Sequence, residues 1–159
     1  MKHEHEVAKH AALEVGKILL NIYTTDYKVD DKGTSPMYSG LNPVTDADRA
    51  SDEYLKTVLT SEFPQYGWFS EETKDSPERL SKERVWIVDP LDGTKEYIEK
   101  VPMWVVSIAL VENKKPVLGI LYNPVKEELF SAVKGEGANL NGEKVSCSTK
   151  TDPSEMVIL

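Results

Sequence analysis

The feature that most constrains the fold of this chain is an apolar run that leads directly into two closely spaced aspartates. The run, residues 85–88, predicts a strand buried on both faces. Asp89 and Asp92 follow, separated in part by Pro90, which fixes its own φ and removes one amide donor. Gly93 then permits a positive φ or a close ligand approach. We therefore expect a rigid turn that presents two carboxylates at the end of a buried strand.

The residues after this turn add a second kind of binding group. Thr94 can cap a helix that starts near Lys95, and the free amides at a helix start favour a phosphate. Carboxylates favour hard divalent cations such as Mg²⁺. A metal and a phosphate on one turn indicate phosphate-ester chemistry, whereas the pattern Asp-x-x-Asp-Gly taken alone is more often a simple loop turn.

Further acidic residues are available to complete such a site. Glu71 follows a short predicted strand at 67–70, and Asp46 and Asp48 lie at the predicted start of a helix. Clustered carboxylates repel one another unless cations neutralise them, so a site that gathers them predicts metal ions. The alternatives are that Glu71-Glu72 is a solvated pair and that one of the two aspartates only stabilises the helix start.

Helical and extended patterns surround these motifs. Apolar residues at helical spacing predict an N-terminal helix, with the stripe Ala8, Ala11, Ala12, Val15, Ile18, Leu19 and Ile22. Residues 24–42 are rich in turn formers and predict the start of a strand followed by a long mobile loop. Extended backbone is expected at 42–45, and a second helix from Asp46 to Phe63-Pro64.

The second half of the chain is mostly strand in pattern. Residues 105–111 and 116–121 predict a hairpin, and 128–133 a further strand. The remaining segments are an exposed excursion at 73–84, a turn cluster at 135–142 and a strand just starting at 156–159. Together these patterns predict an α+β fold in which two helices pack on a largely antiparallel sheet.

Composition narrows the class of partner. The chain has 159 residues, 19 basic and 27 acidic, for a formal charge of -8, which argues against binding a nucleic-acid polymer. No stretch approaches the roughly 20 apolar residues of a membrane span, and the N-terminus has no signal-type apolar core. The lone Cys147 has no partner for an internal disulfide. We expect a cytoplasmic protein with no membrane partner.

Three motifs resemble those of a known superfamily. Asp89-Pro90-Leu91-Asp92-Gly93-Thr94, preceded by Trp86-Ile87-Val88, resembles the signature of the inositol monophosphatase superfamily of Mg²⁺-dependent, Li⁺-sensitive phosphatases. Residues 42–48 and 69–72 are similar to its two earlier motifs, in the same order. Lys95-Glu96-Tyr97 resembles the 3′(2′),5′-bisphosphate nucleotidase branch more than the inositol branch. The resemblance spans roughly residues 5 to 159 and implies the N-terminal half of the layered α/β sandwich of inositol monophosphatase and fructose-bisphosphatase.

The resemblance implies a set of metal ligands. Glu71 and Asp89 would bind a first Mg²⁺, with the Leu91 carbonyl as an additional ligand. Asp89 would bridge to a second ion, which Asp92 would also bind. Two or three Mg²⁺ ions are expected in total.

The resemblance also implies the catalytic roles. Thr94 would orient the attacking water, partnered by Asp48, and the amides of Gly93 and Thr94 would hold the substrate phosphate. The mechanism would be an in-line hydrolysis with no phospho-enzyme. The expected substrate is a small phosphate monoester, the 3′(2′)-phosphate of adenosine 3′,5′-bisphosphate, with an inositol or sugar monophosphate as the alternative.

One family motif has no match in this chain. Family members are longer, and their second half carries a Trp-Asp-x-Ala motif whose aspartate completes the second metal site. We expect residues 1–153 to form the metal-binding α+β domain and 154–159 to begin a second domain absent from this chain. A further hypothesis is therefore a non-catalytic half or fragment, which would form a homodimer or associate with a missing C-terminal half.

Overall fold

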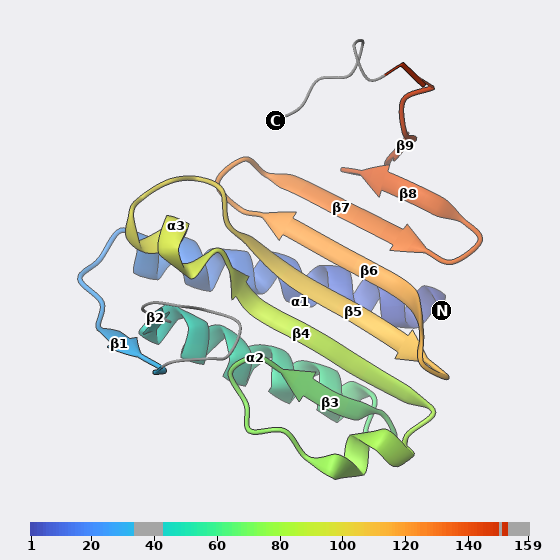
Figure 1. The fold of residues 1–159 in the computed structure, drawn as a ribbon, viewed down its shortest axis with the longest axis horizontal. Coiled ribbons are helices and arrows are strands. Elements are labelled where there is room, and N and C mark those ends of the chain that lie inside the picture. The colour runs from blue at the N-terminus through green and yellow to red at the C-terminus, as the bar shows by residue number, and fades with distance from the viewer. Residues whose placement is uncertain (34–42, 150, 153–159) are drawn as a thin grey trace.

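The computed structural model describes residues 1–33, 43–149 and 151–152 of the chain. Two long helices, α1 (Lys2–Tyr23) and α2 (Asp46–Glu62), lie against one face of a seven-stranded sheet, as Figure 1 shows. The strands of this sheet are β3 (Gly67–Ser70), β4 (Arg84–Asp92), β5 (Val105–Glu112), β6 (Lys115–Asn123), β7 (Glu128–Val133), β8 (Gly137–Leu140) and β9 (Glu143–Val145). The order in space follows the order in sequence.

The sheet is antiparallel except at one edge. β3 and β4 pair in parallel, while every later neighbour from β4 to β9 pairs antiparallel. Two short strands, β1 (Val29–Asp31) and β2 (Pro43–Thr45), form a separate antiparallel ladder. A short helix, α3 (Thr94–Ile98), follows β4, and a 3₁₀ turn, η1 (Pro77–Ser81), precedes β4. The expected α+β fold, with two helices on a largely antiparallel sheet, is confirmed.

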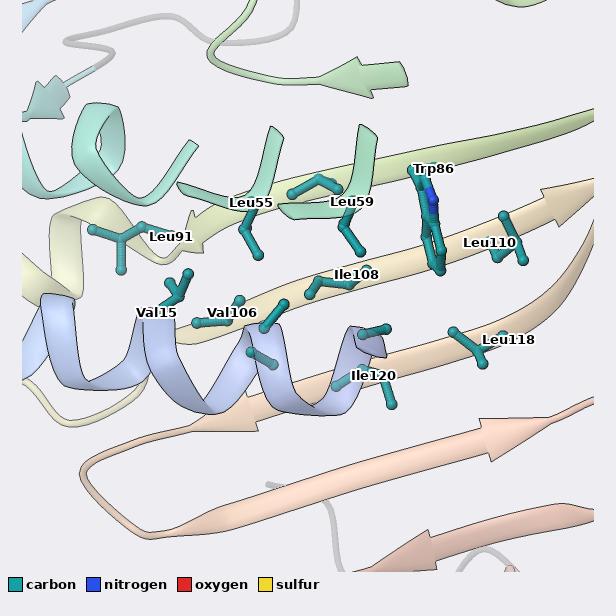
Figure 2. Close-up of a cluster of buried hydrophobic side chains, with 14 of the residues drawn as sticks. Val15, Leu55, Leu59, Trp86, Leu91, Val106, Ile108, Leu110, Leu118 and Ile120 are labelled. Atoms are coloured by element: carbon teal, nitrogen blue, oxygen red, sulfur yellow. The ribbon is translucent and has the colours of Figure 1, made fainter. Parts of the chain in front are cut away.

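The core lies between the helices and the sheet. Figure 2 shows Val15 of α1 and Leu55 and Leu59 of α2 directed toward strand residues such as Ile108 and Trp86. All five side chains are at most 1% exposed. Burial of this kind stabilises a domain by about 25 cal/mol per Å² of apolar surface. The helices therefore form because their apolar stripes have a sheet face to cover.

The predicted hairpin is confirmed and its turn is tight. Glu112 of β5 pairs with Lys115 of β6, so only Asn113 and Lys114 lie in the loop. Both have positive φ, 49° and 65°, as a two-residue turn that follows the strand twist requires.

Three expectations for the strands are wrong in detail. β4 is not buried on both faces, since Ile87 is 38% exposed, because the helices cover only one face of the sheet. The expected turn at the aspartates is instead the end of β4, which pairs with β5 as far as Asp92 through an irregularity after Asp89. The turn cluster at 135–142 contains a strand, β8, because its backbone pairs with β7.

Some expectations fall outside the described residues. These are the long loop through residues 34–42, the strand at 156–159 and the second-domain start at 154–159. In the described part of the chain, no helix combines the length and apolar character that crossing a membrane demands.

Candidate active site

The predicted site residues gather at one end of the sheet. The parallel strands β3 and β4 both run toward the left in Figure 1, where the first turn of α2 and the start of α3 lie. Glu71 directly follows β3, and its amide donates to the Val88 carbonyl of β4 at 3.3 Å. Parallel pairing of two strands therefore brings Glu71, from the first strand, beside the aspartates of the second.

Asp48 is held at the start of α2 by a capping box. Its Oδ2 accepts from the Thr45 amide at 2.7 Å and from the Thr45 hydroxyl at 2.6 Å. The side chain is only 1% exposed. Burial raises the pKa of Asp48, whereas the hydrogen bonds from Thr45 and Thr94 and the nearby charge of Lys32 act to lower the pKa. The carboxylate is thus fixed in place while its burial is partly compensated.

Thr94 faces this carboxylate across the site. Its Oγ1 lies 3.0 Å from Asp48 Oδ1 and 3.2 Å from the Leu91 carbonyl oxygen. Asp46, by contrast, accepts from the Lys28 amide at 3.1 Å and pairs with Arg49. The structure therefore brings Asp48, and not Asp46, to Thr94.

Three carboxylates at the strand ends repel one another. Burial raises the pKa of Asp89 to about 7, with further contributions from the charges of Glu71 and Asp92 and from a hydrogen bond to Glu71. The Leu91 amide donates to Asp89 Oδ1 at 3.2 Å and opposes this rise. Glu71 and Asp92 are exposed, so the group opens to solvent on one side.

A lysine that the motifs do not include lies among these acids. Lys32 Nζ contacts the Glu71 carboxylate at 3.3 Å and pairs with Glu72. Burial acts to lower the pKa of Lys32, but the bonds to Glu72 and Glu71 outweigh burial, and the pKa is raised overall. Burial in turn raises the pKa of Glu72, and Lys32 opposes that shift. The ammonium therefore neutralises part of the acidic cluster.

Gly93 allows a tight approach between the site and the segment just before β5. Its φ is +98°, and a Cβ placed there would lie 3.0 Å from the Met103 carbonyl oxygen and 3.1 Å from Trp104 Cβ. α3 begins at the next residue, and Tyr97 donates its amide to the Gly93 carbonyl at 2.9 Å. A side chain at this position would strain the backbone and displace the neighbouring segment.

The donors fit a hard divalent cation by their chemistry. Carboxylate and carbonyl oxygens are the ligands that Mg²⁺ prefers. Burial first, and then the charges of Glu71 and Asp92, raise the pKa of Asp89, and a bound cation would oppose both effects. Within residues 1–33, 43–149 and 151–152, however, no three acidic, histidine or cysteine side chains are arranged to hold an ion as they stand. The described residues thus supply the donors without a closed coordination shell.

Four residues of this region have contacts in the site that the sequence analysis did not assign to them. They are Thr45, which caps α2, Lys32 and Glu72, which pair beside Glu71, and Asp52, which contacts the turn after β3. The spacing Thr-x-x-Asp was a usable signal for the cap, because Thr45 lies three residues before Asp48. Nothing in the spacing of Lys32 indicated its contact, since it comes from a separate hairpin.

Comparison with known proteins agrees with this arrangement. A family model described as "Inositol monophosphatase family" matches residues 1–159. The chain belongs to the inositol monophosphatase family. An inositol monophosphatase of Dictyostelium discoideum is 39% identical over 147 residues, which are 91% of this chain and 52% of that protein.

Two solved structures show the same fold. The suhB protein of Bartonella henselae superposes with a TM-score of 0.81 at 32% identity, over 91% of this chain and 54% of that one. CysQ of Bacteroides thetaiotaomicron gives a TM-score of 0.72 at 37% identity, over 94% of this chain and 53% of that one. The chain therefore spans about half the length of the family members it matches.

Proposed function

We propose that this chain supplies the carboxylate and hydroxyl groups of a Mg²⁺-dependent phosphate monoester hydrolase. The observation that carries the proposal is the meeting of Asp48, Thr94 and the Leu91 carbonyl at 3.0–3.2 Å. Beside it lie Glu71 and Asp89, which are close enough for Glu71 to raise the pKa of Asp89. Three separate sequence segments converge there, as a hydrolytic site requires.

Glu71, Asp89, Asp92 and the Leu91 carbonyl would hold two or three Mg²⁺ ions. Bound Mg²⁺ supplies Lewis acidity toward water and toward the phosphoryl oxygens. The Lys32 ammonium contacts Glu71 and would have to give up this contact for Glu71 to bind an ion. Asp89, with its raised pKa, would lose its proton to become a ligand.

Thr94 and Asp48 would orient the attacking water. A threonine hydroxyl has one proton, and an ionised carboxylate is a stronger acceptor than a carbonyl. Thr94 therefore donates its proton to a hydrogen bond with Asp48. The lone pairs of Thr94 Oγ1 then remain free to accept a hydrogen bond from a water. Thr45 holds Asp48 in the position in which its carboxylate accepts a hydrogen bond from the Thr94 hydroxyl. The amides of Gly93 and Thr94, at the start of α3, would hold the phosphate.

For the substrate we propose the 3′(2′)-phosphate of adenosine 3′,5′-bisphosphate. Support comes from Lys95-Glu96-Tyr97, which resembles the bisphosphate nucleotidase branch. An inositol phosphate is the second candidate, because the Dictyostelium inositol monophosphatase is 39% identical to this chain. The third possibility is a different function: a half that binds metal without turnover, since the chain spans about half the length of its relatives.

Phosphate release with Mg²⁺, with and without Li⁺, tests the activity. Adenosine 3′,5′-bisphosphate, inositol 1-phosphate and a sugar phosphate are compared side by side, and Mn²⁺ binding is measured on the same sample. Asp89→Asn and Glu71→Gln should abolish release, while Glu53→Gln, on an exposed site of α2, should not. Mn²⁺ binding without release supports the non-catalytic half. If the chain neither binds Mn²⁺ nor releases phosphate, the proposal is refuted.

Association through the uncovered sheet face is tested separately. Ile87, Leu121 and Phe130 expose 38–44% of their surface there. Light scattering of the purified chain, alone and with a C-terminal half of a relative, would detect the homodimer or the paired halves that we propose. A monomer under both conditions contradicts this part of the proposal.

A further inference from the structure

A buried carboxylate in α2 contacts the turn that carries Glu71. Asp52 is 8% exposed, and its Oδ1 accepts from the Ser70 hydroxyl at 2.5 Å. Its Oδ2 accepts from the Thr73 hydroxyl, also at 2.5 Å. One carboxylate therefore ties both ends of a four-residue segment to the same helix, and none of the roles proposed above uses it.

The segment between these two hydroxyls contains Glu71 and Glu72. The Glu72 amide donates to the Ser70 hydroxyl oxygen at 3.2 Å, and the Glu71 amide donates to β4 at 3.3 Å. Apart from these bonds, Glu71 is exposed and paired with the single ammonium of Lys32. The backbone beneath Glu71 is thus held chiefly by the two anchors on Asp52 and by the edge of β4.

Asp52 lies one helical turn after Asp48, so the two share a face of α2. Asp48 contacts Thr94, the first residue of α3, and Asp52 contacts the turn after β3. A single rigid helix therefore sets the distance between the two loops that would carry the metal ligands and the water-orienting hydroxyl.

We propose that Asp52 is a positioning residue that fixes the direction of the Glu71 carboxylate toward Asp89. The proposal rests on the metal-binding role inferred above for Glu71. Residues that orient metal ligands commonly change metal affinity by about 10–100-fold when they are lost. Asp52 would act only through the turn, because its two oxygens are already engaged by Ser70 and Thr73.

A variant can separate this role from simple electrostatic attraction. In Asp52→Asn the side-chain oxygen still accepts from one hydroxyl, and the amide nitrogen donates to the other, which can rotate to accept. Both contacts survive while the negative charge is lost. Asp52→Ala removes contacts and charge together. Glu53→Ala is the matched control, because Glu53 is the adjacent carboxylate on the exposed side of α2.

Amide hydrogen exchange in the metal-free chain tests the anchoring directly. Asp52→Ala should speed exchange of the Glu72 amide at least about tenfold, whereas Asp52→Asn and Glu53→Ala should leave it close to wild type. Thr73→Val, which removes only one anchor, should give a smaller increase and remains informative if Asp52→Ala fails to fold. Unchanged exchange in both Asp52→Ala and Thr73→Val overturns the proposal.

Mn²⁺ affinity, followed by titration calorimetry, tests the consequence for the site. Asp52→Ala should weaken binding about 10–100-fold, while Asp52→Asn restores it to within about threefold of wild type. A loss in Asp52→Asn as large as in Asp52→Ala would show that charge and not position matters, and would overturn the proposal. If wild type binds no Mn²⁺, the proposed function fails, and the exchange experiment alone decides whether Asp52 anchors the turn.

Discussion

Replacing Asp89 by asparagine should stabilise the metal-free chain at alkaline pH while removing its metal affinity. Burial and the charges of Glu71 and Asp92 raise the pKa of Asp89 to about 7 from its ordinary value of 3.8. The folded chain therefore binds this proton more tightly than the unfolded chain does. Between pH 4 and pH 7 the unfolded state loses the proton first, so stability falls as the pH rises. Asparagine has no proton to lose in this range, so the variant keeps the stability that wild type loses.

The size of the effect follows from the pKa shift. A rise from 3.8 to about 7 is about 3 units, and each unit corresponds to about 1.4 kcal/mol, which sets a ceiling of about 4 kcal/mol. Asp89 is only partly buried, and solvent screening reduces the cost, so we expect about 2 kcal/mol above pH 7. For a domain of this size that amounts to about 4–8 °C in Tm.

Urea unfolding in EDTA at pH 4.5 and pH 8 measures this difference. Asp89→Asn should be more stable than wild type by about 2 kcal/mol at pH 8, and the gain should shrink to about 1 kcal/mol at pH 4.5, which lies closer to the unfolded pKa of 3.8. Adding Mg²⁺ should then reverse the order, because a cation at 100 times its Kd stabilises wild type by about 2.7 kcal/mol and has no intact site in the variant.

The control for this experiment is Glu53→Gln, which removes an exposed carboxylate of the same helix that holds Asp48. The difference in free energy of unfolding between Glu53→Gln and wild type should be about the same at pH 4.5 and pH 8. The reasoning is refuted if the Asp89→Asn gain is the same at both pH values, or if the variant is the less stable protein at pH 8.

Three further predictions concern the neighbours of Asp89. Lys32→Met removes the ammonium that contacts Glu71, so Mn²⁺ affinity measured by calorimetry should rise severalfold, and an unchanged affinity would contradict competition between lysine and metal. Thr94→Val removes the hydroxyl that donates to Oδ1 of the buried Asp48, while Oδ2 keeps its two donors from Thr45; the loss should cost about 1–3 kcal/mol in urea unfolding, most of which Thr94→Ser should restore. Gly93→Ala forces a Cβ to 3.0 Å from a carbonyl oxygen at φ +98° and should lower stability by more than about 1 kcal/mol in thermal unfolding, whereas a neutral result would show that the segment relaxes.

Much of the architecture was predictable because its signals are local. The stripe from Ala8 to Ile22 predicts α1, and the acidic first turn after an extended segment marks the start of α2. The hairpin of β5 and β6 follows from two apolar runs around a short polar loop. Each of these elements is specified by neighbours within a few residues, so a single sequence is enough to predict it.

The errors in the fold arose where the environment comes from distant segments. Ile87 continues an apolar run, and nothing in that run shows that helices cover only one face of β4. The glycines at 135 and 142 predict turns, yet the residues between them form β8 because β7 offers an unpaired edge. Strand pairing depends on partners far along the chain, and a local pattern cannot identify them.

The site divides in the same way. The motifs indicated Glu71, Asp89, Asp92 and either Asp46 or Asp48, because carboxylates at strand ends and a helix start carry a recognisable chemistry, and the family resemblance selected Asp48 and Thr94 for the attacking water. Folding alone decided that Asp48 faces Thr94, that Lys32 contacts Glu71 and that Asp52 anchors the turn beneath it. Those contacts join residues 18 to 46 positions apart, and only packing of α2 and the β1–β2 ladder against the strand ends brings such residues within hydrogen-bond distance.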